Sequence, residues 1–294
     1  MHADEVETGP DLVRRLLAAQ FPQWADLPME RVESAGTDHA IYRLGADLSV
    51  RLPRIGWAMR QADKERRWLP RLAPHLPLTI PVPLASGVPA EGYPYQWSVY
   101  RWLAGEDAAV APVDLREAAI AVADFVDALQ RIDPTGGPIA TDESRGAPLA
   151  RRDASTRRAI AALAGTIDTD AATAVWDTAL AAGEWDGDPV WFHGDLLPGN
   201  LLVDQRRVHA VIDFGGLGIG DPACDLMIAW GLFSGESRAL FRAALGVDDA
   251  SWARGRGHAL SQAAIFVPYY TETNPVGVAR ARHSIDEVLA DRDL

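Results

Sequence analysis

Two stretches decide the fold of this chain: WFHGDLLPGNLLV at residues 191–203 and VIDFG at residues 211–215. Within them, three polar side chains, Asp195, Asn200 and Asp213, interrupt runs of apolar residues. Aspartate and asparagine beside glycine and proline are also ordinary turn formers. What favours a functional site over three turns is the ordered combination of all these features in one short segment.

The tetrapeptide DQRR at residues 204–207 separates two short apolar runs and predicts a β-hairpin. A register centred near residues 206–207 would place Asn200 and Asp213 opposite one another at the open end, about 5 Å apart. An amide oxygen and a carboxylate are hard ligands that suit Mg²⁺ together with phosphate oxygens and water. Asp195 could project into the same site and accept the proton of an attacking hydroxyl.

The spacing H-x-D-x-x-x-x-N, then a hairpin, then D-F-G resembles the catalytic loop and metal-binding motif of protein-kinase-like enzymes. The sequence has His193-Gly194-Asp195 at the first motif, Ile212-Asp213-Phe214-Gly215 at the second, and GDPACDL at residues 220–226. With glycine between His193 and Asp195, the chain resembles the aminoglycoside phosphotransferase family of small-molecule kinases.

The resemblance implies a role for each matching residue. Asp195 would be the catalytic base, and Asn200 and Asp213 would hold Mg²⁺. His193 would orient the loop by packing. Asp225 would lie in the first turn of the next helix and fasten the catalytic loop through backbone hydrogen bonds.

The first hundred residues read as a helix capped by Asp11 and then as a small sheet. Short, partly alternating segments predict five strands, at residues 31–35, 40–44, 48–52, 82–86 and 96–102. Apolar residues at spacings of three and four predict one main helix over residues 57–72.

After residue 112 most segments have helical periodicity. Predicted helices cover residues 114–132, 151–164, 170–182, 222–233, 236–245 and 252–270. These elements agree with what the resemblance implies, which is an α+β, bilobal, protein-kinase-like fold with a five-stranded antiparallel N-terminal lobe and a larger helical C-terminal lobe. Residues 1–102 would form the nucleotide-binding lobe, 103–112 the hinge, and 113–294 the lobe with the catalytic loop and the acceptor site.

The third predicted strand carries Arg51 where kinases have the lysine that holds the α- and β-phosphates. Arginine keeps the charge but is bulkier and is not equivalent to lysine. Alternation along the strand places Arg51 and Ser49 on the face opposite Val50 and Leu52. Glu65 on the predicted helix is the expected partner of Arg51, and a surface ion pair is the alternative.

Other nucleotide contacts are predicted more weakly. Thr37, Asp38 and His39 follow a single glycine, so their turn could cradle phosphate or be a plain hairpin turn. Tyr100 and Trp102 precede the hinge, where their backbone groups would pair with the adenine edge, although their aromatic side chains could instead be core.

Charge is divided unevenly along the chain. Residues 1–102 contain 12 basic and 12 acidic residues, so the net charge of −13 lies wholly in residues 103–294. An acidic second half disfavours nucleic acid and anionic membranes and favours a cationic acceptor, although acidic surfaces also keep proteins soluble. Candidate acceptor contacts, each of which could also lie on a solvated face or in packed structure, are Glu106, Asp107, Tyr270, Glu272, Asp286 and Glu287.

The remaining features predict a cytoplasmic protein. Cys224 is the single cysteine, so no intrachain disulfide forms, and we expect it to be a buried small residue. The acidic, polar N-terminus does not read as a signal peptide, and no apolar run approaches membrane-spanning length. We expect a monomer or weak dimer.

The predicted function is transfer of the γ-phosphoryl group of ATP or GTP, with Mg²⁺, to a hydroxyl of a small, cationic molecule such as an aminoglycoside. A macrolide, an endogenous amino alcohol or an amino sugar is the alternative acceptor. Two other classes stay open. A pseudokinase would bind nucleotide without turnover, and a metal-dependent phosphohydrolase would use His193, Asp195 and Asp213.

Overall fold

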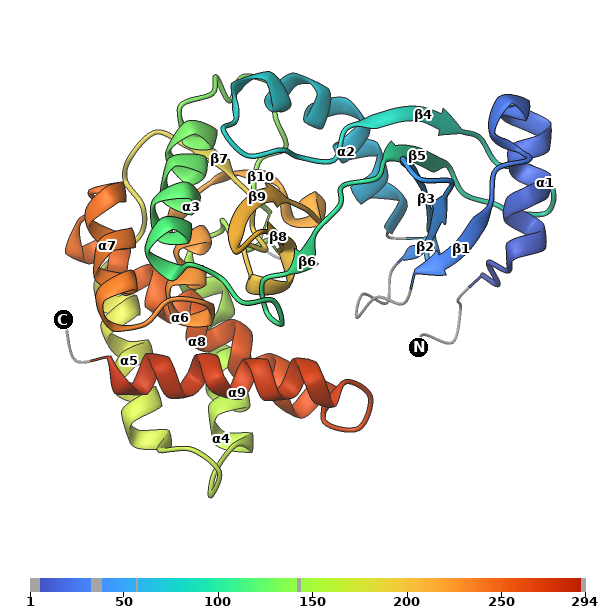
Figure 1. The fold of residues 1–294 in the computed structure, drawn as a ribbon. Coiled ribbons are helices and arrows are strands. Elements are labelled where there is room, and N and C mark those ends of the chain that lie inside the picture. Colours follow the sequence, from blue (N-terminus) through green and yellow to red (C-terminus); the bar gives the residue numbers. More distant parts are fainter. Residues whose placement is uncertain (1–5, 33–38, 57, 142–143, 292–294) are drawn as a thin grey trace. The chain divides into compact units, whose positions relative to one another are not determined.

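The computed structural model describes residues 6–32, 39–56, 58–141 and 144–291. The chain forms two compact units (Figure 1). The first comprises residues up to 74 together with 79–104, and the second comprises residues 75–78 and everything from 105 onward. No helix within the described ranges is both long and apolar enough to cross a membrane.

The first unit contains the predicted five-stranded antiparallel sheet. Its order is β1-β2-β3-β5-β4. The strands are β1 (Met29–Val32), β2 (His39–Leu44), β3 (Leu48–Pro53), β4 (Pro83–Gly87) and β5 (Trp97–Arg101). Strand β1 begins two residues before the predicted segment, and residues 33–35 of that prediction lie outside the described residues.

Two α-helices accompany this sheet, α1 (Pro10–Gln20) and α2 (Ala58–Leu72), and a 3-10 turn follows each of them, at Pro22–Trp24 and Ala73–His75. Helix α1 begins with Pro10 at its first position and has Gly9 as its N-cap. The prediction that Asp11 caps this helix is therefore wrong. Proline fits the first position because it has no backbone N–H and the helix needs no donor there, and Asp11 accordingly lies in the first turn.

The two faces of β3 serve different purposes. Val50 and Leu52 are fully buried in an apolar cluster with Leu16 and Leu17 of α1. The alternate residue Arg51 emerges on the other face, where it meets α2. Alternation along β3 thus separates the core from a charged site, as predicted.

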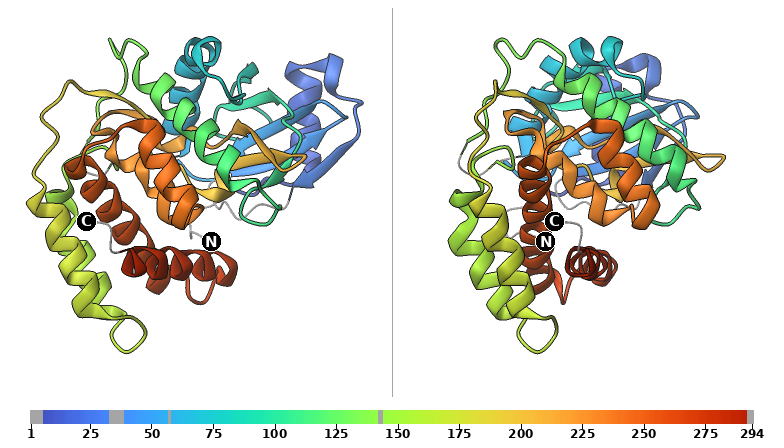
Figure 2. Two further views of the ribbon diagram at one scale, coloured as in Figure 1. Left: turned by 60° about the vertical axis from the view of Figure 1, so that its left-hand side comes forward. Right: turned by 90° about the vertical axis from the view of Figure 1, so that its left-hand side faces the viewer.

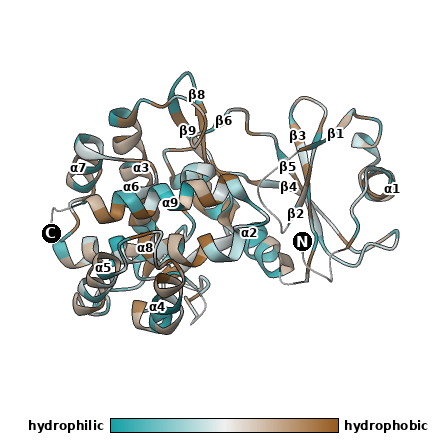
Figure 3. Ribbon diagram, turned by 90° about the horizontal axis from the view of Figure 1, so that it is seen from below, coloured by the Kyte–Doolittle hydropathy of each residue, from teal (hydrophilic) through white to brown (hydrophobic). Residues whose placement is uncertain are grey.

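The second unit is mainly helical. Its α-helices are α3 (Leu115–Gln130), α4 (Asp153–Ala162), α5 (Thr169–Ala181), α6 (Ile228–Gly231), α7 (Gly235–Leu245), α8 (Asp249–Tyr270) and α9 (Pro275–Ala290). Helices α4 and α5 lie side by side (Figure 2). Helix α8 packs against α9, α5 and α4, and its ribbon carries both hydrophilic and hydrophobic residues (Figure 3). Its residues from Ser251 to Leu260 are all buried, polar ones included.

Two small antiparallel sheets carry the informative stretches of sequence. One contains β6 (Glu106–Asp107), β8 (Leu201–Asp204) and β9 (Arg207–Val211), and the other pairs β7 (Val190–Phe192) with β10 (Gly218–Gly220). The predicted hairpin is confirmed as β8 and β9. Neither β6 nor β10 was predicted, because both are too short to show a periodicity.

Two predicted helices have a different form. Residues 222–233 fold as a 3-10 helix, Pro222–Met227, followed by the single turn of α6. The segment predicted to start at residue 151 begins as a 3-10 turn, Leu149–Arg152, before α4. Asp221 caps the first of these 3-10 helices by accepting the backbone N–H of Ala223. Every residue of this 3-10 helix is buried, and Asp225 completely so.

Candidate active site

The loop after β7 makes a sharp turn at Gly194. Its φ is +80°, and a Cβ there would lie 2.4 Å from the carbonyl oxygen of Gly216. Such a distance is well inside van der Waals contact, and positive φ is costly for other residues. The glycine between His193 and Asp195 is therefore required by the close approach of the Phe214–Gly216 turn.

Asp225 fastens this loop from the interior. Its Oδ2 atom accepts the backbone N–H of His193, and its Oδ1 atom accepts that of Gly194, both at 2.7 Å. Burial raises the pKa of Asp225, while these hydrogen bonds and nearby cationic groups oppose the rise. The predicted fastening contact is confirmed.

His193 joins the two motifs. Its Nδ1 atom accepts the backbone N–H of Asp195 at 3.1 Å, so Nε2 carries the proton and donates to the carbonyl of Ile212, also at 3.1 Å. Its ring packs against Phe214 with centroids 4.5 Å apart. A fully buried histidine with both nitrogens occupied in this way orients the loop.

Asn200 lies beside Asp195 as expected. Its side-chain amide nitrogen donates to the backbone oxygen of Asp195 at 2.8 Å and to the carboxylate Oδ2 at 3.2 Å. Asn200 occupies the end of a 3-10 turn, Pro198–Asn200, that leads into β8. The donor end of the amide thus faces Asp195, and among the described residues no hydrogen bond to the amide oxygen is present.

The hairpin register differs from the predicted one. The turn is centred on Gln205 and Arg206, both with positive φ, and a bulge at Leu202/Val203 shifts the pairing by one residue. As a result, Asn200 is opposite Ile212, whose N–H donates to the Asn200 carbonyl at 2.8 Å. Asp213 follows one residue later in the left-handed conformation, with φ of 63°. The expectation that Asn200 and Asp213 form a cross-strand pair is wrong.

Asn200 and Asp213 nevertheless offer a donor set that fits Mg²⁺. One contributes an amide oxygen and the other a half-buried carboxylate, and Mg²⁺ commonly takes one or two protein oxygens and completes its shell with phosphates and water. No group of three or more His, Cys, Asp and Glu residues suited to a metal occurs in the described part of the chain. A site with two protein ligands is consistent with that observation.

Arg145 was missed by the sequence analysis. Its Nη1 atom donates both to the Gly194 carbonyl and to Oδ1 of Asp195. The residue precedes Asp195 by 50 positions, in a segment without periodicity or motif, so no signal in the sequence could have identified it.

The first unit contains a second polar cluster, centred on Glu65. Nη1 of Arg51 donates to both carboxylate oxygens of Glu65, at 3.0 and 3.1 Å, and Glu65 is completely buried. The hydroxyl of Tyr100 donates to Oε2 of Glu65 at 2.9 Å. Burial, followed by the charge of Glu65, raises the pKa of Tyr100. The predicted Arg51–Glu65 ion pair is confirmed.

The structure describes three of the five other residues that were predicted to contact the nucleotide. His39 is buried with Nδ1 3.4 Å from Nη2 of Arg51, whereas Thr37 and Asp38 lie outside the described residues. Tyr100 is paired with neighbouring strands on both sides, and the N–H of Trp102 donates to the carbonyl of Asp47. A role for their backbone groups in binding adenine stays a prediction.

The candidate acceptor residues are spread over β6, the end of α8, the turn that follows α8, and α9. Glu106, Glu272 and Asp286 are exposed, and Tyr270 packs against Phe266. Asp107 accepts the Ala109 N–H and pairs with Arg280 at 3.3 Å.

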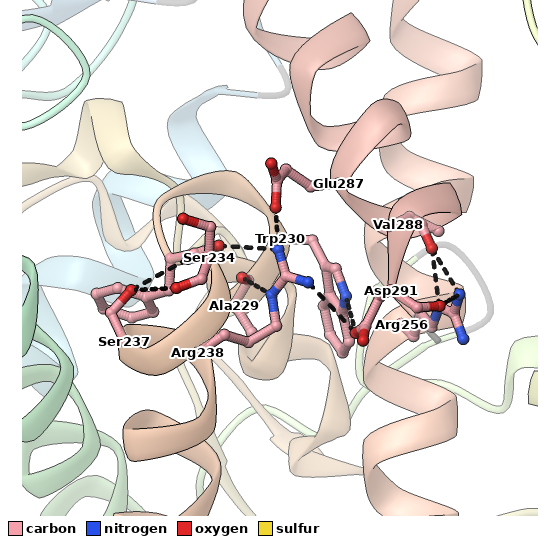
Figure 4. A network of polar contacts seen from close by, with 10 residues as sticks. Ala229, Trp230, Ser234, Ser237, Arg238, Arg256, Glu287, Val288 and Asp291 are labelled. Atoms are coloured by element: carbon pink, nitrogen blue, oxygen red, sulfur yellow. Dashed lines mark hydrogen bonds and ion pairs between the residues drawn. The ribbon is translucent and has the colours of Figure 1, made fainter. Parts of the chain in front are cut away.

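Glu287 belongs to a structural network rather than to an open surface. It pairs with Arg238, whose Nε also donates to the Ala229 carbonyl at 2.9 Å (Figure 4). Asp291 joins the same guanidinium and accepts the indole N–H of Trp230. The polar contacts of Glu287 are therefore explained by the joining of α9 to α6 and α7.

Comparison with solved structures supports a phosphotransferase fold. The GDP and kanamycin complex of APH(2″)-IIIa matches with a TM-score of 0.73 at 18% identity, covering 95% of this chain and 99% of that one. The apoenzyme of macrolide 2′-phosphotransferase MphH from Brachybacterium faecium matches with a TM-score of 0.61 at 22% identity, covering 94% and 97%. The streptomycin–ATP complex of APH(2″)-IIa matches with a TM-score of 0.60 at 15% identity, covering 97% and 99%.

Among curated proteins, no sequence matches this chain significantly. The model of the phosphotransferase enzyme family matches residues 31–259, which include the Arg51–Glu65 pair and the whole catalytic loop with Asp225. The chain therefore belongs to the phosphotransferase enzyme family.

Proposed function

We propose that the protein transfers the terminal phosphoryl group of ATP or GTP to a hydroxyl group of a small molecule, with Asp195 as the base. The observation that carries the proposal is the way Asp195 is presented. Its loop is fastened by Asp225, and its carboxylate lies beside the amide of Asn200, at the hairpin end that leads to Asp213. Together these contacts support a carboxylate preorganised for proton transfer.

The chemistry needs few protein groups. The acceptor hydroxyl donates its proton to the carboxylate of Asp195 as its oxygen forms the new bond to phosphorus. The bond from phosphorus to the bridging oxygen of the nucleotide breaks, and the nucleoside diphosphate leaves with that electron pair. Catalysis then rests on positioning and on neutralisation of charge.

Asn200 and Asp213 would hold Mg²⁺ through the amide oxygen and the carboxylate. When bound, the ion would neutralise charge on the phosphate oxygens. The protein's own contribution is to fix Asn200, whose amide nitrogen is occupied by Asp195, so that its oxygen keeps one orientation.

In the first unit, the Arg51–Glu65 pair would bind the α- and β-phosphates. Glu65 holds the Arg51 side chain through one guanidinium nitrogen. The fork geometry of a guanidinium suits phosphate oxygens. Tyr100 restrains Glu65 from the other side and completes this support.

The identity of the small molecule that accepts the phosphoryl group is the most specific part of the proposal. A net charge of −13, confined to residues 103–294, supports a cationic acceptor. The matched structures include enzymes named for aminoglycosides and for macrolides, so aminoglycosides come first and macrolides second, with amino alcohols and amino sugars after them. We further expect a cytoplasmic monomer or weak dimer.

An acceptor panel tests the proposal. ADP and GDP release would be measured with kanamycin, gentamicin, a macrolide, choline and glucosamine, with and without Mg²⁺. Transfer to one acceptor that disappears in Asp195→Asn, while nucleotide still binds, is expected. Nucleotide binding without any turnover would indicate a pseudokinase, and diphosphate release that no acceptor accelerates would indicate a hydrolase.

A further inference from the structure

The two carboxylate oxygens of Asp195 have different partners. Oδ2 accepts from the Asn200 amide, on the side of the carboxylate that leads to β8 and Asp213. Oδ1 accepts from Nη1 of Arg145. Arg145 and Asn200 therefore hold the carboxylate between them, each through a different oxygen.

Arg145 also holds the peptide that precedes Asp195. The same Nη1 atom donates to the carbonyl oxygen of Gly194. The N–H of that residue is held by Asp225. The Gly194 residue is thus fixed at its N–H and at its carbonyl by two opposite charges, one from each side of the turn.

Burial makes these contacts effective. The side chains of Arg145 and Asp195 retain only 22% and 27% of their exposure, so water screens the pair less than it would a surface ion pair. A charge-assisted bond in such a place restricts the rotation of a short side chain about its own bonds. The carboxylate is therefore held in one rotamer before any substrate arrives.

The charge of Arg145 also reaches the surrounding interior. Burial is the main cause that lowers the pKa of Arg152, and the charge of Arg145 is the second. The pKa of His258 is lowered first by burial, then by the charge of Arg152, and then by that of Arg145. Only Nη1 of Arg145 donates to an acceptor in the part of the chain that the structure describes. Within the described residues, the hydrogen bonds of Arg145 go to the Gly194 carbonyl and the Asp195 carboxylate, and it pairs with no other carboxylate.

We propose that Arg145 is a positioning residue of the phosphoryl transfer, which fixes the Asp195 carboxylate and the Gly194 peptide in the geometry that receives the hydroxyl proton. The inference rests on the proposed function. A misplacement of about 1 Å at a reacting group costs on the order of 100-fold in rate. Loss of Arg145 therefore lowers kcat and leaves nucleotide affinity unchanged.

Arg145→Met and Arg145→Lys would test this role, with Arg151→Met as the control. Methionine keeps the length of the side chain without the charge, lysine keeps a cation with several donors, and Arg151 is an exposed arginine nearby. Turnover would be measured with the best acceptor of the panel and with water as the acceptor. Arg145→Met should lose about 10- to 100-fold in kcat with an unchanged Kd for Mg-ATP. Arg145→Lys should recover at least part of that loss, and Arg151→Met should match the wild type.

A double-mutant comparison separates positioning from general structural support. In the Asp195→Asn background, single turnovers followed over hours should show no more than a twofold further loss from Arg145→Met, because the residue acts through Asp195. An equal loss in both backgrounds, or no loss in either, would overturn the inference. If Arg145→Met fails to fold, the same comparison with Arg145→Lys decides.

The two proposals fail in different ways. Full activity of Asp195→Asn would remove the proposed function itself. Loss of activity in Asp195→Asn together with full activity in Arg145→Met would remove only the role of Arg145.

Discussion

The carboxylate of Asp225 accepts the backbone N–H of His193 at 2.7 Å, across 32 positions of sequence. With the matching bond from Gly194, both of its oxygens are used on one turn. A completely buried carboxylate that holds two consecutive amides is a main support of the turn at His193 and Gly194.

Replacement of Asp225 by asparagine should destabilise this loop. The new NH₂ group would face a backbone N–H, so at least one buried donor would lose its partner, at about 1–3 kcal/mol. Urea unfolding should show a loss in that range, and turnover should fall at the same time. Asp186→Asn, at an exposed loop position, is the control and should change neither. Unchanged stability of Asp225→Asn would contradict the fastening role.

Gly194→Ala should be far more harmful than an alanine at another glycine of similar φ. Gly183 has φ of +78°, and a Cβ added there would have nothing within 4 Å, so its substitution costs only the conformational term of about 1–2 kcal/mol. At Gly194 alanine would carry the same conformational cost, and in addition its Cβ would clash with the Gly216 oxygen at 2.4 Å. Thermal unfolding and turnover of the two variants would be compared. Equal effects would show that the close approach is unimportant.

The Glu65 cluster predicts graded losses. Glu65→Ala leaves the Arg51 guanidinium half-buried without its carboxylate, which should cost about 3 kcal/mol and weaken Mg-nucleotide binding. Tyr100→Phe removes one hydrogen bond and keeps the ion pair, at about 1 kcal/mol. Urea unfolding and nucleotide titration measure both effects. A Tyr100→Phe effect as large as that of Glu65→Ala would contradict the central position of the carboxylate.

His258 predicts a dependence of stability on pH. Burial, with Arg152, Arg145 and Arg254 nearby, lowers its pKa from 6.5 to about 3, so it is neutral in the folded protein. The unfolded chain binds a proton at this residue below pH 6.5. Its contribution to the free energy of unfolding therefore falls by about 1.4 kcal/mol per pH unit as the pH drops from 6.5 toward 3.

The difference between the wild type and His258→Gln isolates this contribution from other groups. Urea unfolding at pH 7, 6 and 5 should show the wild type losing stability relative to the variant at each step below 6.5. A difference that does not change with pH would show that His258 takes up its proton equally in both states.

Sequence patterns located the residues that lie on regular elements or within fixed spacings. Alternation along β3 correctly predicted the face on which Arg51 lies, and the resemblance to kinases supplied Glu65 of α2 as its partner. The spacing of Asp195 and Asn200 placed both beside the same turn. Periodicity and motif spacing, together with the resemblance to kinases, were enough to predict these contacts.

Features that depend on tertiary packing could not be read in this way. The turn of the hairpin is centred on residues 205–206, one position earlier than predicted, and a bulge adds one residue to β9, so Asn200 lies opposite Ile212 instead of Asp213. Neither feature changes the apolar pattern from which the register was predicted. Glu287 is one of the acidic residues assigned to an open, acceptor-binding surface, but in the structure it forms an ion pair with Arg238. Arg145 reaches the catalytic loop from a segment without regular structure, where no periodicity predicts a contact.

The central claim is that Asp195 serves as the base in phosphoryl transfer to a small-molecule hydroxyl. Transfer of ³²P from γ-labelled ATP and GTP to the acceptor panel, compared between the wild type and Asp195→Asn, tests it most directly. The account predicts a labelled acceptor with the wild type, and at least a 100-fold slower transfer by a variant that binds Mg-nucleotide normally. Equal labelling by both proteins, or no labelled acceptor from a nucleotide-bound wild type, would contradict it.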